Sequence, residues 1–201
     1  MLLPESDLLF NFPPDWVVRK YDATDAYQSL SGHGLKGVDF LALSPDGYLW
    51  LIEVKNFRPR FAAGLEYRAK RRSPEHLAAQ VARKFSDTLR LIHIVDRALR
   101  KHWYRRLKLW YVERVAGDQQ SNYWFWSEAK RRIDVAAKVV YVLWLETPEK
   151  KATYDESTRA LLAALLPPGA TLFVAESDRP AGLPFSAGPA GEASAEGQDL
   201  P

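Results

Sequence analysis

Two acidic residues and one lysine stand inside runs of apolar residues, where charged side chains are unusual. Asp39 lies in the apolar run 37–43, and Glu53 and Lys55 lie in the apolar run 48–55. An unpaired buried carboxylate is costly, so these positions require a cation or a proton. A divalent metal ion bound by carboxylate oxygens meets that requirement.

The two apolar runs predict a β-hairpin. They are rich in β-branched, aromatic and leucine residues, and turn residues bound them. The connection, residues 44–47, offers proline and aspartate for a type I turn and glycine for the left-handed position that follows. Pairing the residues that flank this loop sets Asp39 directly opposite Glu53, with Lys55 on the same face. Apolar residues on both faces predict a central hairpin that is covered on both sides.

The sequence of Asp39 followed by Glu53-Val54-Lys55 on the next strand resembles the core motif of the PD-(D/E)XK nuclease superfamily, over roughly residues 16–95. This resemblance implies that Asp39 and Glu53 bind Mg²⁺, with Mn²⁺ as a substitute, and that Lys55 orients or activates the attacking water. It also implies an α/β fold: a three-layer restriction-endonuclease-like domain with a central mixed β-sheet flanked by helices. Val38 stands where the family name places proline.

The resemblance also directs attention to helices on either side of the hairpin. The family often supplies another acid from a preceding helix, and here the candidates are Asp22, Asp25 and, far upstream, Glu5. Of these, Asp22 is the candidate metal ligand. In some branches a Gln or Lys on the helix after the lysine strand reaches the active site, which makes Gln80 an auxiliary candidate beside Lys84. A solvated helix edge is the alternative interpretation of these two.

Positive charge is concentrated in the middle of the chain. Between residues 58 and 114 there are 16 Lys and Arg against 5 Asp and Glu, although the whole chain carries a net charge of only +3. Such a block beside carboxylates suits a polyanionic substrate, and a solvated charged surface is the alternative. The residues expected to bind nucleic acid are Arg58, Arg60, Arg68, Lys70, Arg71, Arg72 and Lys84.

Basic and aromatic residues are mixed throughout residues 100–134, and this mixture has two interpretations. Together such residues can bind single-stranded nucleic acid. Packing of the aromatic rings in a core is favoured, because Leu107, Leu109 and Val112 alternate as in a strand.

The chain of 201 residues is long enough for one domain with a substantial core. We expect a single nuclease-like domain over residues 1–177 and a disordered Pro/Gly/Ala-rich tail over residues 178–201. The predicted elements are strands over 16–21, 138–146 and 171–175, helices over 24–31, 74–99 and 155–166, and a polar loop over 57–73.

Composition narrows the class of protein further. The chain has no cysteine, which excludes disulfides and thiolate metal sites. Its four histidines lack metal-ligand spacing. No signal peptide or membrane-spanning run is evident, so we expect a cytoplasmic protein without a membrane partner. A homodimer is left open, because nothing in the sequence marks an interface.

Three hypotheses for function remain. The first is a metal-dependent nuclease that hydrolyses phosphodiester bonds of nucleic acid, with DNA favoured. The second is a catalytically inactive nucleic-acid-binding protein that retains the nuclease fold. In the third, Asp39, Glu53 and Lys55 form a buried ionic cluster in a protein of unrelated purpose.

Overall fold

A mixed sheet of five strands forms the centre of the fold. The computed structural model describes residues 1–24, 28, 35–62, 65–67, 71–116, 118–135, 138–147 and 152–190. The strand order is β3-β4-β5-β8-β9. A three-stranded sheet, β1-β2-β10, and a hairpin, β6-β7, complete the described strands. The strands are β1 (Leu2–Glu5), β2 (Leu8–Asn11), β3 (Val17–Lys20), β4 (Phe40–Leu43), β5 (Leu49–Asn56), β6 (Arg60–Ala62), β7 (Leu65–Tyr67), β8 (Val139–Glu146), β9 (Thr171–Ala175) and β10 (Ser186–Pro189).

The central sheet has an antiparallel half and a parallel half. Strands β3, β4 and β5 are antiparallel neighbours, and the short segment 44–48 connects β4 to β5. Helical crossovers make β5, β8 and β9 parallel. The carboxyl ends of β5 and β8 therefore meet at one edge of the sheet. The helices are α2 (Pro74–Arg100), α3 (Trp103–Tyr111), which continues as a π-helix (Val112–Ala116), α4 (Asn122–Asp134) and α5 (Ala152–Leu165), and Tyr21–Ala23 form a 3₁₀ turn.

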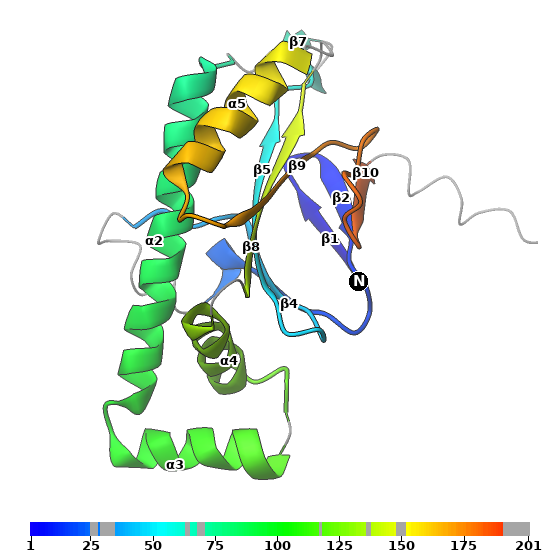
Figure 1. The fold of residues 1–201 in the computed structure, drawn as a ribbon. Helices are drawn as coiled ribbons and strands as arrows, with labels where there is room; N and C mark the ends of the chain where they lie inside the picture. The colour runs from blue at the N-terminus through cyan, green and yellow to red at the C-terminus, as the bar shows by residue number, and fades with distance from the viewer. Residues whose placement is uncertain are drawn as a thin grey trace, which may run out of the picture.

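Helices α2, α4 and α5 lie along one face of the central sheet (Figure 1). Ser73 caps α2 by accepting a hydrogen bond from the backbone N–H of His76 at 3.4 Å, and Pro74 occupies the first turn. As the helical spacing predicts, Leu77 and Phe85 are buried against the sheet. This packing fixes the orientation of α2 and therefore the direction in which its remaining side chains point.

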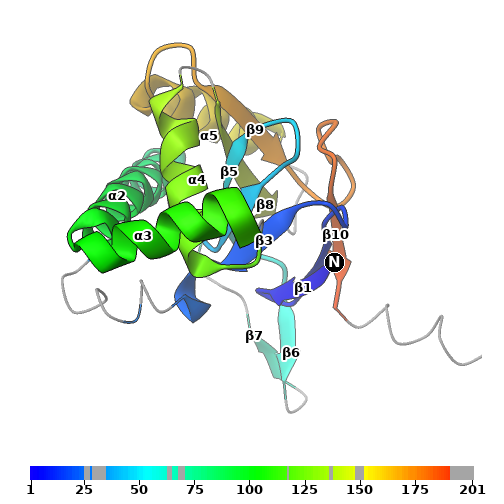
Figure 2. The same cartoon turned by 90° about the horizontal axis from the view of Figure 1, so that it is seen from below.

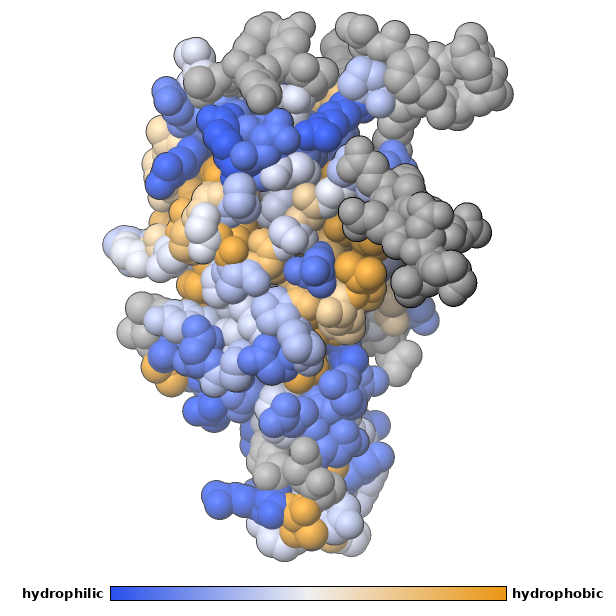
Figure 3. All heavy atoms as spheres, turned by 90° about the vertical axis from the view of Figure 1, so that its right-hand side faces the viewer, coloured by the Kyte–Doolittle hydropathy of each residue, from blue (hydrophilic) through white to orange (hydrophobic). Residues whose placement is uncertain are grey.

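The small sheet β1-β2-β10 covers the opposite face of the central sheet (Figure 1). Its core is aromatic: the ring of Phe10 lies 5.2 Å from those of Phe40 and Trp144, and Phe12 lies 5.0 Å from Phe185. The fold is thus a mixed α/β arrangement in which the described helices α2, α4 and α5 cover one face of the central sheet. The expectation that helices flank the sheet is wrong for the second face, where a sheet takes their place. Figure 3 shows the surface of the molecule from the side of this small sheet. Apolar residues gather over the middle of that surface, and hydrophilic residues prevail at the end that carries α3.

Part of the segment expected to be a disordered tail belongs to this second layer. Residues 186–189 form β10, which pairs antiparallel with β2. Phe185 is 3% exposed and Ala187 is 9% exposed, so both side chains anchor this segment in the aromatic core. The expected boundary after Ser177 is therefore wrong for residues 178–190, and residues 191–201 lie outside the described part.

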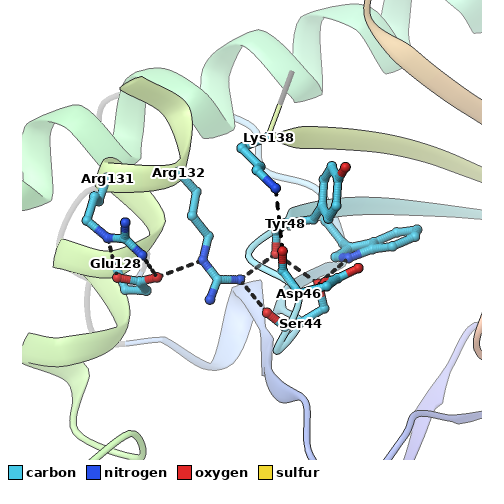
Figure 4. A network of polar contacts seen from close by, with 8 residues as sticks. Ser44, Asp46, Tyr48, Glu128, Arg131, Arg132 and Lys138 are labelled. Atoms are coloured by element: carbon cyan, nitrogen blue, oxygen red, sulfur yellow. Dashed lines mark hydrogen bonds and ion pairs between the residues drawn. The ribbon is translucent and has the colours of Figure 1, made fainter. Parts of the chain in front are cut away.

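The turn of the central hairpin is held by a residue of α4 (Figure 4). Gly47 has a φ of 91°, which is the left-handed conformation that the turn pattern predicts. Arg132 donates from Nη1 to the backbone carbonyls of Ser44 and Tyr48, at 2.9 and 2.5 Å, and its Nε donates to Glu128. This clamp holds the hairpin in the register that Phe40 opposite Ile52 defines.

Two further expectations about local structure are corrected. The predicted polar loop contains the hairpin β6-β7, which projects from the body of the molecule (Figure 2). The apolar alternation over 107–112 is not a strand but part of helix α3 and its π-helical continuation. Of the predicted helix over 24–31, only Thr24 and Gln28 are described. Among the described residues, no helix combines the length and apolar character needed to cross a bilayer.

Candidate active site

Asp39 and Glu53 face each other across the central hairpin, as the turn predicts. Phe40 pairs with Ile52, so the preceding residue, Asp39, comes opposite Glu53. Glu53 is fully buried, whereas the side chain of Asp39 is 20% exposed. One carboxylate oxygen of Asp39, Oδ2, accepts a hydrogen bond from the backbone N–H of Val54 at 2.6 Å, which leaves Oδ1 for other partners.

Two lysines meet the carboxylates. Lys55 Nζ lies 2.5 Å from Glu53 Oε1. Lys84, from α2, places its Nζ 2.8 Å from both oxygens of Glu53 and 3.6 Å from Asp39 Oδ1. The four formal charges cancel, so the chain itself supplies the cations that two opposed carboxylates require.

A buried threonine explains why α2 delivers Lys84 to this place. Thr88 is fully buried, and its Oγ1 donates to the backbone carbonyl of Lys84 at 2.7 Å. The same oxygen accepts a hydrogen bond from the backbone N–H of Val38 at 3.1 Å. Thr88 thereby ties the helix to the segment that leads into Asp39. Gln80 lies one turn before Lys84, and within the described part of the chain it makes no hydrogen bond to either carboxylate.

The surroundings shift the protonation of three of these groups. Burial raises the pKa of Asp39, and the opposing effect of Lys84 does not overcome it. Burial and then the nearby charge of Asp39 raise the pKa of Glu53. For Lys84, burial lowers the pKa, but the carboxylates of Glu53 and Asp39 outweigh burial and raise it. The site therefore holds protons more tightly than its separate side chains would in water.

A cavity of about 300 Å³ opens beside Asp39. Lys84 and Lys36 contribute positive charge to its lining, and Glu5 and Asp22 contribute further acids. Glu5 is paired with Lys20 of β3 at 2.8 Å. Asp39 and Lys84 thus border a space that small molecules can enter, while Glu53 lies behind them.

The cavity wall depends on one glycine. A Cβ atom built on Gly37 would lie 1.8 Å from the ring of Tyr21, far inside van der Waals contact. Tyr21 is 2% exposed and lines the same cavity. Gly37 therefore lets the chain pass over the tyrosine ring immediately before it reaches Asp39.

The two opposed carboxylates fit a Mg²⁺ ion, which takes one or two protein carboxylates and completes its shell with water and substrate phosphate. Asp39 Oδ1 borders the open side, and both Glu53 oxygens face the flexible ammonium of Lys84. Among the described residues, no group of three or more His, Cys, Asp or Glu side chains is arranged to hold a metal. Asp22, the candidate further ligand, is exposed in the cavity lining and does not join the pair as a third ligand.

The basic residues expected to bind nucleic acid have separate surroundings. Arg58 Nη2 lies 2.5 Å from the buried carboxylate of Glu146. The guanidinium of Arg71 lies 4.4 Å from the ring centre of Tyr154 on α5. Arg72 contacts His76 at the start of α2, and Arg71 and Arg72 line one shallow pocket there. For Arg60 only the backbone is described, and Arg68 and Lys70 lie outside the described residues.

Sequence reasoning did not find the second buried acid. Glu146 ends the apolar run of β8 and is fully buried. Its Oε1 accepts hydrogen bonds from Trp144 Nε1 at 2.9 Å and from the backbone N–H of Ser177 at 2.8 Å. The sequence signal that could have identified Glu146 is the one that identified Asp39 and Glu53: an acidic residue within or at the end of an apolar strand.

No protein-family model, curated protein or solved structure matches the chain. Function therefore has to be inferred from the chemistry of the carboxylate pair, its two lysines and the cavity beside them.

Proposed function

We propose that the chain is a metal-dependent nuclease of the PD-(D/E)XK type that hydrolyses phosphodiester bonds of nucleic acid, with DNA as the expected substrate. One observation carries the proposal: the carboxylates of Asp39 and Glu53 meet the ammonium groups of Lys55 and Lys84, and Asp39 and Lys84 line a cavity. The mixed sheet that places the acids on adjacent strands supports it further.

In the proposed reaction, Asp39 and Glu53 would hold Mg²⁺ through their carboxylate oxygens. When bound, the ion would supply Lewis acidity that activates water and stabilises negative charge on the phosphate. Lys55, whose ammonium group contacts Glu53, would orient the attacking water. Lys84 compensates the two carboxylates, and its flexible side chain can turn toward a phosphate oxygen at the cavity.

A second candidate function is a nucleic-acid-binding protein that does not hydrolyse its ligand. The observation that favours it is the pairing of both Glu53 oxygens with ammonium groups. In this case Lys84 stays between the carboxylates permanently, and the cluster serves only to join α2 to the hairpin.

Cleavage of end-labelled single-stranded DNA, duplex DNA and RNA, each with Mg²⁺ or Mn²⁺, tests the proposal. We expect Asp39→Asn and Glu53→Gln each to lower the cleavage rate by roughly 100-fold or more, the usual loss when one stabilising group is removed. Glu156→Gln, at an exposed position of α5, is the matched control and should cleave like the wild type. Cleavage that survives both site substitutions contradicts the nuclease assignment.

Isothermal titration with Mn²⁺ separates the two candidates. A nuclease should bind Mn²⁺, and Asp39→Asn should abolish binding. If the wild type binds nucleic acid but neither binds Mn²⁺ nor cleaves in any divalent metal, the binding protein is the correct assignment.

A further inference from the structure

Helix α3 turns a row of large apolar side chains away from the body of the molecule. Leu109 and Val112 face inward and are 2% and 7% exposed. On the opposite side of the helix, four exposed apolar residues recur at helical spacing. They are Trp103 (76%), Leu107 (56%), Trp110 (54%) and Tyr111 (52%). The packing interpretation of these aromatic residues is therefore wrong, although it holds for Phe125 and Trp126 of α4, which are buried.

Positive charge surrounds this row. Residues 100–115 contain six Lys and Arg and a single Glu. Arg106 and Lys108 are exposed on the two flanks of the apolar row. Lys108 Nζ also lies 4.5 Å from the ring centre of Tyr123, at the start of α4.

A basic cleft of about 1170 Å³ lies along the second half of α2, and Lys130 of α4 contributes to its lining. Arg90 and Arg97 of α2 and Lys101 just after α2 line it, and none of the three pairs with an acid within the described part of the chain. Among the described residues, Asp96 is the only acid in its lining, and Arg100 neutralises it at 2.9 Å. The cleft therefore presents uncompensated guanidinium groups.

The cleft lining reaches Lys101, and α3 begins two residues later at Trp103, so the aromatic row starts close to the end of the cleft. Figures 1 and 2 show α3 at one end of the molecule, beyond α4, so its outer side is not covered by the described elements. Along α2, 16 residues separate Lys84 from Arg100, which is a distance of about 24 Å.

We propose that this surface binds an unpaired strand of nucleic acid, with phosphates in the cleft and bases stacked on Trp103 and Trp110. Arginines without partners suit phosphates, and exposed indole rings suit bases, so the strand uses both parts of the surface. The inference rests on the proposed function, for which it names the substrate class: a nucleic acid with a single-stranded portion.

Fluorescence anisotropy of a labelled single strand, measured in EDTA so that no cleavage occurs, tests this inference. The strand should be about 30 nucleotides long, which exceeds the roughly 4–16 nucleotides that one binding fold covers. We expect the double variant Trp103→Ala/Trp110→Ala to weaken binding about 25-fold or more, since each lost stacking contact costs about fivefold or more. A blunt duplex should bind more weakly than the single strand.

The charge contribution is tested by salt titration. Removing two phosphate contacts with Arg90→Gln/Arg97→Gln should reduce the slope of log K against log salt by roughly 1.4. The tryptophan variant should keep the wild-type slope. Leu165→Ala and Arg159→Gln, both exposed on α5, are the matched controls and should bind like the wild type.

Unchanged affinity in both double variants overturns the inference. Two further results overturn it. One is a dimer in sedimentation velocity that dissociates when the tryptophans are substituted, and the other is binding to phosphatidylserine vesicles but not to the single strand. Failure of the nuclease proposal is seen separately: strand binding that depends on the tryptophans, without cleavage in any metal, leaves this inference standing. Cleavage with unaffected binding in the variants removes the inference and leaves the nuclease.

Discussion

Glu53 and Glu146 are both fully buried near the ends of adjacent parallel strands, yet they face opposite sides of the sheet. Glu146 meets one guanidinium, that of Arg58 at 2.5 Å, and accepts hydrogen bonds from uncharged donors such as the Ser177 N–H. Glu53 meets a second carboxylate, Asp39, and two ammonium groups.

The difference shows that burial of a carboxylate does not by itself identify a site. Glu146 is paired with a single guanidinium and with uncharged donors, which is the arrangement of a structural ion pair. Glu53 and Asp39 repel each other, and the flexible side chains of Lys55 and Lys84 balance their negative charge. In the proposed nuclease, a metal ion and a phosphate would replace part of this balance and would enter through the cavity beside Asp39.

The largest expected contrast between the two acids is in catalysis. Glu53→Gln should lower the cleavage rate by roughly 100-fold or more, whereas Glu146→Gln should change it by less than about threefold, because its partners are structural. Single-turnover cleavage of a labelled strand measures both variants. Equal losses of cleavage rate in Glu53→Gln and Glu146→Gln would contradict the distinction between a catalytic and a structural acid.

The cationic partners should differ in their effect on stability. Lys84→Met leaves two carboxylates with Lys55 alone and should reduce the free energy of unfolding by about 3 kcal/mol, the lower end of the cost of breaking a buried pair. Arg58→Met should cost less than Lys84→Met, because the arginine side chain is 35% exposed and Glu146 keeps its hydrogen bonds from Trp144 and Ser177. Urea unfolding at neutral pH measures both, and the reverse order would show that Glu146 is the more strained site.

Metal binding should stabilise one acid cluster and not the other. At 100 times its dissociation constant, Mn²⁺ should add about 2.7 kcal/mol to the free energy of unfolding of the wild type. Asp39→Asn should abolish this gain, and Glu146→Gln should retain it. Thermal denaturation with and without Mn²⁺ makes the measurement, and a gain that persists in Asp39→Asn places the ion elsewhere.

The smallest effect concerns pH. Because the pKa values of Asp39 and Glu53 are raised in the folded protein, the folded state holds these protons more tightly than the unfolded state. Their contribution to stability is complete below the unfolded values of about 4 and is lost as pH rises through the folded values. We expect Asp39→Asn/Glu53→Gln to remove this decline in urea unfolding between pH 4 and neutrality. An identical pH profile in the variant and the wild type would contradict it.

Most of the central framework was predictable because its signals are local. Turn residues defined the hairpin and its register, and helical spacing defined α2 and its buried face. The strand-like alternation of Leu107, Leu109 and Val112 was misleading, because residues 107–112 are helical. In the structure, Leu109 packs on the helix face that also carries Val112, while Leu107 lies on the exposed side.

By itself the sequence determined the opposition of Asp39 and Glu53, because a three-residue turn and strict alternation leave a single pairing. Only the tertiary structure decided which cations meet these acids, that residues 185–189 return to the aromatic core, and that the aromatic face of α3 stays uncovered. The reason is physical: turns and periodicity act between near neighbours along the chain, whereas ion pairing and burial depend on segments that only folding brings together.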